Sequence, residues 1–133
     1  MIITICGSLK HLREMVATKK TLVDLGHTVE LPHKSEQFLK ENDFEETASI
    51  KKKNWYIKKH LEKIKKSNAI LVVNEDKNDV KNYIGGNTFL EMGFAFALNK
   101  PIFIKNPIPD IHYKDEILGM LPIVLDGDLS KIK

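Results

Sequence analysis

Continuous apolar runs alternate with amphipathic stretches along this chain. Five runs, mostly rich in Ile and Val, have the pattern of strands that are covered on both faces. These runs lie at residues 2–6, 28–31, 69–73, 101–105 and 122–125. Helical patterns lie between them at about residues 9–25, 49–66, 87–98 and 113–120, while residues 32–48 carry no pattern that we can assign. The alternation predicts a parallel sheet with right-handed crossovers.

The expected fold is an α/β, flavodoxin- or Rossmann-like open sheet of about five parallel strands in the order 2-1-3-4-5, with helices on both faces. A chain of 133 residues fits one domain, residues 1–133. Such sheets bind ligands at the carboxyl ends of their strands, where the strand order reverses. We therefore expect a site between the first and third strands, formed by the segments CGSLKH, NEDKND and GGNTFLE.

The composition of the chain limits the kinds of function that we expect for the protein. Apolar residues make up 42% of the chain and charged residues 29%, as in ordinary soluble proteins. No basic region precedes the first apolar run and no run reaches the roughly 20 residues that span a bilayer, so we expect a cytoplasmic protein without a membrane partner. The single cysteine, Cys6, excludes an internal disulfide, and the five histidines lack zinc-ligand spacing. Neither a metal nor a cofactor is expected.

Lysines are concentrated between residues 51 and 66, which raises the question of nucleic-acid binding. The apolar positions there follow helical spacing, which places the lysines on the opposite, solvated face; these positions are Ile50, Ile57, Leu61 and Ile64. Arg13 is the sole arginine, and no stacking aromatics accompany it. The pattern favours an acidic small molecule over nucleic acid as the partner.

The segment GSLKHLR follows the first predicted strand. Gly7 permits a sharp turn and Ser8 can cap the following helix, which leaves backbone N–H groups facing an anion. Lys10, His11 and Arg13 add donors within the first turns. The alternatives are a phosphate site and an ordinary strand-to-helix turn.

Glu91 is the only charged residue between Lys81 and Lys100. One interpretation is a capping box, because Thr88-x-x-Glu91 matches its spacing. The other interpretation is a functional role for Glu91. The apolar helix around it is expected to be buried on most sides, and a buried carboxylate without a partner is costly in free energy. Glycines and alanines at residues 93, 95 and 97 are expected to face the sheet, and the preceding Gly85 and Gly86 leave room for a ligand.

The loop after the third strand supplies a second carboxyl group. We select Asp76 there, because two carboxyl groups could divide the work as in retaining glycosidases. Cys6 is expected to be a core residue, since no His lies at a recognisable partner position. Trp55 is also expected in the core, with Tyr56 or His60 at the border of the pocket.

Three segments taken in order suggest a family: ITICGSLKHLREM, KSNAILVVNEDK and GGNTFLEMGFAFALNKPIFI. They resemble the nucleoside 2-deoxyribosyltransferase-like proteins, which include the deoxynucleoside 5'-monophosphate N-glycosidases. The most specific part is the pattern Glu-x-Gly-x-Ala-x-Ala-x-x-Lys-Pro from Glu91 to Pro101. The resemblance implies that Glu91 attacks the anomeric carbon, that Asp76 assists the leaving base, and that a neighbouring subunit completes the pocket in at least a dimer.

Several alternatives remain open at this point. The run from Gly85 to Thr88 replaces the family's usual Asp-x-Gly-Thr and also resembles phosphoribohydrolases, which act on ribonucleoside monophosphates. Ser8, Leu9 and Lys10 stand where the transferases carry aromatics, so hydrolysis and base transfer are both open, as is a nucleotide-sensing module without turnover. The predicted substrate-binding residues are Gly7, Ser8, Lys10, Arg13, Asn74, Gly85, Gly86 and Asn87.

Overall fold

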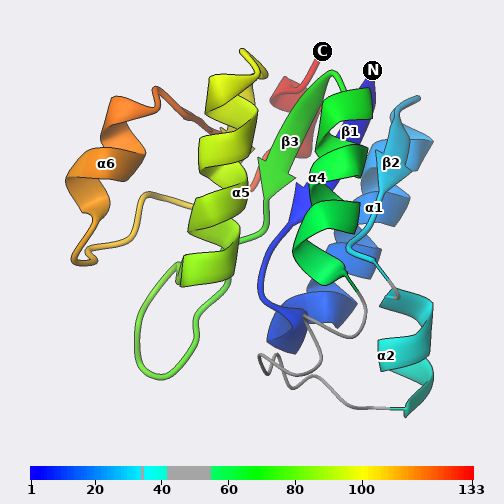
Figure 1. Cartoon of the computed structure of the whole chain (residues 1–133), viewed down its shortest axis with the longest axis horizontal. Coiled ribbons are helices and arrows are strands. Elements are labelled where there is room, and N and C mark those ends of the chain that lie inside the picture. Colours follow the sequence, from blue (N-terminus) through cyan, green and yellow to red (C-terminus); the bar gives the residue numbers. More distant parts are fainter. Residues whose placement is uncertain (34, 42–54) are drawn as a thin grey trace.

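A computed structural model describes residues 1–33, 35–41 and 55–133 of the chain. Its centre is a five-stranded sheet in which all strands are parallel, in the order β2-β1-β3-β4-β5. Figure 1 labels the first three strands of the chain, β1, β2 and β3. The strands are β1 (Ile2–Cys6), β2 (Thr28–Glu30), β3 (Ala69–Val72), β4 (Ile102–Ile104) and β5 (Ile123–Val124). The predicted fold class and strand order are confirmed.

The helices connect these strands. They are η1 (Leu9–His11), α1 (Leu12–Asp24), α2 (Ser35–Glu41), α4 (Tyr56–Lys66), α5 (Gly86–Ala97), α6 (Lys114–Gly119) and η2 (Leu129–Lys131). The helices predicted at 9–25, 87–98 and 113–120 are confirmed, whereas α2 falls in the stretch that carried no prediction. The beginning of the helix predicted at 49–66 lies outside the described residues.

Strand side chains alternate between two apolar clusters, one on each face of the sheet. Ile3, Ile5 and Leu71 pack in the cluster that includes the buried residues of α1. Cys6, Ile70 and Val72 pack in the cluster that includes residues of α4, α5 and α6. The helices therefore cover both faces, as doubly wound sheets require.

The buried face of helix α4 is rotated relative to the predicted one, although Ile64 is buried and Leu61 is half-buried, as that prediction requires. Tyr56, His60 and Ile64 are buried, whereas Ile57 is 39% exposed. The buried stripe thus follows an i, i+4, i+8 spacing that begins one position earlier than the aliphatic pattern indicated. Ile50, which the pattern also included, is outside the described residues.

Trp55 was predicted in the core, and this prediction is wrong. It immediately precedes α4 in a left-handed conformation, with φ of 50°, and its side chain is 65% exposed. The ammonium group of Lys58 lies 5.7 Å from the centre of its ring. The indole thus borders solvent at the start of the helix.

Helix α5 is apolar around its circumference but is buried on one face only. The buried residues are Thr88, Glu91, Met92 and Ala95. Gly93 and Ala97, predicted against the sheet, are exposed, as are large apolar residues including Leu90, Phe96 and Leu98. Helical rotation explains the correction, because positions 93 and 97 lie on the side away from the buried stripe. In the described part of the chain, no helix is both long and apolar enough to span a bilayer.

Candidate functional site

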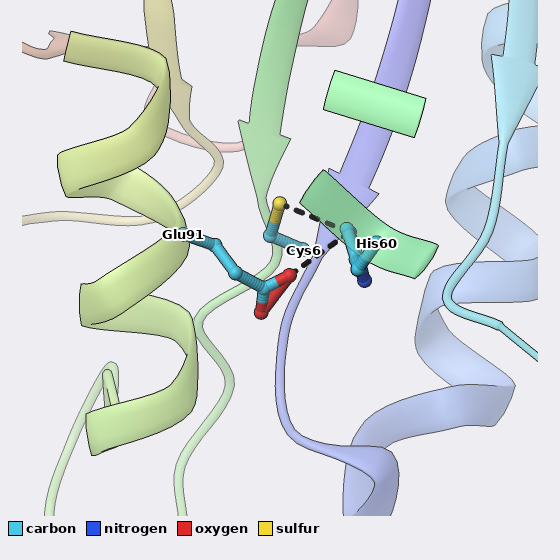
Figure 2. Close-up of side chains that lie close together, drawn as sticks. All are labelled: Cys6, His60 and Glu91. Atoms are coloured by element: carbon cyan, nitrogen blue, oxygen red, sulfur yellow. Dashed lines mark hydrogen bonds and ion pairs between the residues drawn. The ribbon is translucent and has the colours of Figure 1, made fainter. Parts of the chain in front are cut away.

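Three side chains with reactive groups meet at the carboxyl end of β1 (Figure 2). Cys6 is the last residue of β1, His60 belongs to α4 and Glu91 to α5. The Nε2 atom of His60 lies 3.5 Å from the Cys6 Sγ and 2.9 Å from the Glu91 Oε2. The exposed fractions of the three side chains are only 0%, 1% and 3% in sequence order.

The packing of the two helices produces this meeting. Helices α4 and α5 lie side by side over the same face of the sheet (Figure 1). His60 stands in the buried stripe of α4, and Glu91 stands in the buried stripe of α5. Strand β1 lies between β2 and β3, so the cluster is at the point where the strand order reverses.

The carboxylate of Glu91 is held by side chains and not by the helix N-terminus. Asn87 Nδ2 donates a hydrogen bond of 2.9 Å to Oε1. The Oε2 atom makes the short contact with His60, although the angle of that contact is not that of a hydrogen bond. Because the N-cap of α5 is Gly85, Glu91 does not occupy the third helical position, and the capping-box interpretation is wrong.

Cys6 is buried in the core, as predicted, but it also has a histidine partner that the sequence did not indicate. The two residues are 54 positions apart, and no local motif indicates that they meet. Burial, followed by the charge of the Glu91 carboxylate beside it, raises the pKa of the Cys6 thiol well above its usual value. The thiol is therefore protonated at neutral pH.

This arrangement differs from a cysteine-nucleophile relay. In such relays the cysteine and the orienting group contact opposite nitrogens of the imidazole. Here Cys6 and Glu91 both face Nε2, and His60 Nδ1 has no hydrogen-bond partner within the described residues. The cluster is better described as a buried carboxylate with two neighbouring groups.

The loop after β1 lies close to the loop after β3. Ser8 is the N-cap of η1, and its Oγ accepts hydrogen bonds from the Lys10 N–H at 3.3 Å and from Lys77 Nζ at 3.1 Å. His11 Nε2 lies 2.9 Å from the Asp76 carbonyl oxygen. Lys77 thus spans the predicted crevice. Sequence reasoning missed it because only the acidic residues of NEDKND were considered there.

Asp76 is exposed in the loop after β3. Its Oδ1 accepts a hydrogen bond of 2.9 Å from the Asn82 N–H, which helps to shape that loop. The loop also contains a tight reversal in which Lys77 and Val80 exchange two backbone hydrogen bonds. Asn78 and Asp79 at the centre of the reversal both have positive φ, as a type I′ turn requires. Asp76, the second predicted carboxyl group, therefore lies on a hydrogen-bonded loop that follows the carboxyl end of β3.

Among the remaining predicted residues, Asn74 holds neighbouring loops in place, and Gly85 and Gly86 lie at the start of α5. The Asn74 side chain is fully buried and bonds to backbone groups of the loops around it. A Cβ on Gly85 would lie 3.0 Å from the Tyr83 ring, whereas a Cβ on Gly86 would meet nothing within 4 Å. Gly86 thus leaves open space at the start of α5, one residue before Asn87. Arg13, in the first turn of α1, is exposed.

The similarity of this chain to known proteins lies in its structure. No protein-family model matches the chain, and no curated protein sequence does. Among solved structures, a 2-deoxyribosyltransferase from the psychrotolerant bacterium Bacillus psychrosaccharolyticus is similar, with a TM-score of 0.55 and 25% sequence identity. The match covers 78% of this chain and 71% of that chain. The chain has a nucleoside 2-deoxyribosyltransferase-like fold.

The similarity confirms the family resemblance at the level of fold. In this nucleoside 2-deoxyribosyltransferase-like fold, the carboxyl edge of the sheet carries the loops after β1 and β3 and the start of α5. Glu91, Asn87 and Ser8 all lie at or beside this edge.

Proposed function

We propose that the protein cleaves the N-glycosidic bond of a nucleoside or nucleoside 5'-monophosphate with retention of configuration, using Glu91 as the nucleophile. The observation that carries this proposal is a carboxylate with only 3% exposure, oriented by Asn87 and His60 at the carboxyl edge of the sheet. Buried, oriented carboxylates are costly and are typical of functional sites. The similarity to a 2-deoxyribosyltransferase supports a substrate of the nucleoside class.

The proposed reaction has two steps. A Glu91 carboxylate oxygen bonds to the anomeric carbon while the bond from carbon to base nitrogen breaks, and the base leaves with that electron pair. Asp76, acting as a general acid, supplies a proton to the leaving base. Water, or a second base, then attacks the anomeric carbon and gives its proton to the Asp76 carboxylate, while the bond from that carbon to the Glu91 oxygen breaks and its electron pair returns to the oxygen. Two inversions therefore give retention.

The other predicted residues have proposed roles around this reaction. The loop after β1 binds the 5'-phosphate, and Lys77 extends that site because its ammonium group already contacts Ser8. In this proposal the first turn of α5 lies beside the sugar, because Asn87 in that turn donates a hydrogen bond to the Glu91 carboxylate. The proposed phosphate ligands are Gly7, Ser8, Lys10, Arg13 and Lys77, and the proposed sugar contacts are Gly85, Gly86 and Asn87. Asn74 is left out, because its side chain bonds to backbone groups.

A second candidate function is nucleotide binding without turnover. The observation that favours it is that both Glu91 oxygens already contact side chains, so the carboxylate must leave its present partners before it can attack. If the protein is an enzyme, the similarity to a 2-deoxyribosyltransferase supports base transfer. Action on ribonucleoside monophosphates would instead make the protein a phosphoribohydrolase. The identity of the acceptor and of the sugar separates these activities.

Self-association is proposed as well, at the level of a dimer or higher assembly. The support is the exposed apolar side of α5, where Leu90 is 44% exposed and Phe96 is 49% exposed. Large apolar residues grouped on one exposed helix face are typical of protein interfaces. Sedimentation or light scattering of the purified chain tests this proposal.

The nucleophile assignment is tested by the variant Glu91→Gln. The amide keeps the size of the side chain and can still accept the Asn87 hydrogen bond, but it lacks the anionic charge that attacks the sugar. We expect base release to fall on the order of 10³-fold or more, and stability to stay the same or rise because a buried charge is removed. The measurement is chromatographic detection of free base from nucleosides and from their 5'-monophosphates, with thermal unfolding in parallel.

The matched control is Glu62→Gln, which removes an exposed carboxylate from α4. This variant should release base at the parent rate. Full activity of Glu91→Gln under the same conditions would remove Glu91 as the nucleophile. Stabilisation by nucleotides without any base release from the parent protein would favour the binding module.

A further inference from the structure

We propose that Cys6, His60 and Glu91 form a binding site for a thiophilic divalent cation, with Zn²⁺ as the best match. Their donor atoms come from three elements far apart in the sequence, yet all lie within 4.8 Å of one another. All three side chains are more than nine-tenths buried. Histidine spacing along the chain indicated no such site, because only the packing of α4 and α5 against β1 creates it.

The directions of the donors favour a shared metal over a relay. Cys6 Sγ and Glu91 Oε2 both face Nε2 of the same imidazole, so the three atoms surround one point (Figure 2). A thiolate and an imidazole bound to one tetrahedral Zn²⁺ lie about 3.5 Å apart, given the usual bond lengths. The distance from Cys6 Sγ to His60 Nε2 is 3.5 Å.

The Glu91 contact needs only a small adjustment. An imidazole nitrogen and a carboxylate oxygen on one tetrahedral Zn²⁺ lie about 3.3 Å apart, compared with 2.9 Å in the structure. Asn87 already holds Oε1 by a hydrogen bond, which leaves Oε2 as the ligand atom. Such outer hydrogen bonds commonly orient the ligands of a metal.

The chemistry of the donor set selects the class of cation. One thiolate and one carboxylate balance the charge of a divalent ion, so the bound site is neutral in a buried position. Sulfur and imidazole ligands favour zinc and similar transition metals over Mg²⁺ or Ca²⁺. Three protein ligands leave the fourth position of a tetrahedral ion for a water molecule.

Metal binding has a consequence for activity, and this consequence rests on the proposed function. A cation on Oε2 withdraws the electron pair that Glu91 uses to attack the sugar. The loaded protein is therefore expected to be inactive in base release, and a chelator should restore activity. The binding of the cation itself is independent of the reaction.

The first experiment titrates the metal-free wild-type chain with Co²⁺ as a spectroscopic substitute for Zn²⁺. We expect a thiolate-to-cobalt charge-transfer band that saturates at one cobalt ion per chain and disappears when Zn²⁺ is added. Because Cys6 is the only cysteine, this band can arise from no other residue. Absence of the band from the folded wild-type chain would overturn the proposal.

Variants then test the other ligands. Cys6→Ser and His60→Asn should each lower the Zn²⁺ affinity by 10-fold or more, while His112→Ala, which removes an exposed histidine, should leave it unchanged. Circular dichroism of the metal-free variants checks that they are folded. Equal Zn²⁺ affinity in all three variants would assign the bound ion to the surface and overturn the site. If a ligand variant fails to fold, the wild-type cobalt spectrum decides alone.

A separate assay addresses inhibition. Base release by the wild-type chain is measured without metal, with Zn²⁺ at the concentration that saturates the site, and after a chelator is added. We expect loss and recovery of activity, and unchanged activity at saturation would overturn the inhibition. A metal-free chain without any base release would instead overturn the proposed function and the inhibition with it, while the cobalt spectrum would still decide the metal site.

Discussion

At the scale of single residues, Gly7 lies where the end of β1 approaches the end of β3. The Val73 N–H donates a hydrogen bond of 2.8 Å to the Cys6 carbonyl, which brings the two backbones together. A Cβ on Gly7 would lie 2.9 Å from the Val73 carbonyl oxygen and 3.1 Å from the Met15 Sδ. Because one of these neighbours is backbone, the position has no room for a side chain.

The first residue-scale prediction concerns Gly7→Ala. We expect the substitution to lower the free energy of unfolding by about 1–3 kcal/mol, because the added methyl forces the two strand ends apart. Urea unfolding followed by circular dichroism measures the change. Gly86→Ala is the matched control, since its Cβ meets nothing within 4 Å and alanine favours the first turn of α5. Equal stability of the two variants would contradict the account of Gly7.

At the scale of elements, Asn74 joins the loop after β3 to the loop after β4. Its Nδ2 donates to the carbonyl oxygens of Asn106 and Pro107 at 3.2 and 3.1 Å, and its Oδ1 accepts from the Asn106 N–H at 2.9 Å. The Asn106 side chain returns a hydrogen bond of 3.0 Å to the Asn74 carbonyl oxygen. These reciprocal bonds fix the two loops beside the candidate site.

We predict that Asn74→Ala is strongly destabilising. It removes a fully buried amide and leaves the half-buried backbone groups of Asn106 without their side-chain partner, and we expect a loss of about 3 kcal/mol in the free energy of unfolding. Asn68→Ala is the control, because the side chain of this exposed residue accepts one hydrogen bond, of 2.7 Å, from the Ile2 N–H. We expect the control to lose no more than about 1.5 kcal/mol. A loss for Asn74→Ala as small as that of the control would show that the loops hold together without it.

At the scale of the whole molecule, the buried thiol links folding to pH. The folded chain keeps the Cys6 proton because burial and the Glu91 carboxylate raise the pKa of that thiol. In the unfolded chain the thiol loses its proton above about pH 9. The unfolded state then binds fewer protons than the folded state, so stability must fall as the pH rises further.

The corresponding prediction compares the wild-type chain with Cys6→Ser. Above about pH 9, the wild-type free energy of unfolding should decrease more steeply than that of the variant, by up to about 1.4 kcal/mol per pH unit. Tyr113, whose pKa is also raised by burial, contributes a decrease of the same sign in both proteins. The measurement is urea unfolding at several pH values under metal-free conditions. Parallel pH profiles of the two proteins would mean that the Cys6 thiol titrates alike in the folded and unfolded chain, which would contradict the prediction.

The strand order and the position of Glu91 could be predicted from the sequence because their signals are local. Apolar runs separated by helical patterns predict strands that alternate with helices and therefore a parallel sheet. The right-handed crossovers of such a sheet restrict the order of its strands. A single carboxylate within a long apolar helix is visible without any structure. The prediction that Glu91 is buried was correct, as its 3% exposure shows.

The neighbours of Glu91 were decided only by tertiary structure. Helix α5 begins after Gly85, which removes the capping box, and α4 turns His60 inward where the aliphatic pattern favoured Ile57. The buried cluster joins residues 54 and 31 positions apart along the chain, and no local pattern encodes that separation. The sequence by itself therefore determined the sheet and the buried carboxylate. Helix rotation and packing decided that Cys6 and His60 meet it, because small changes in helical phase exchange inward and outward side chains.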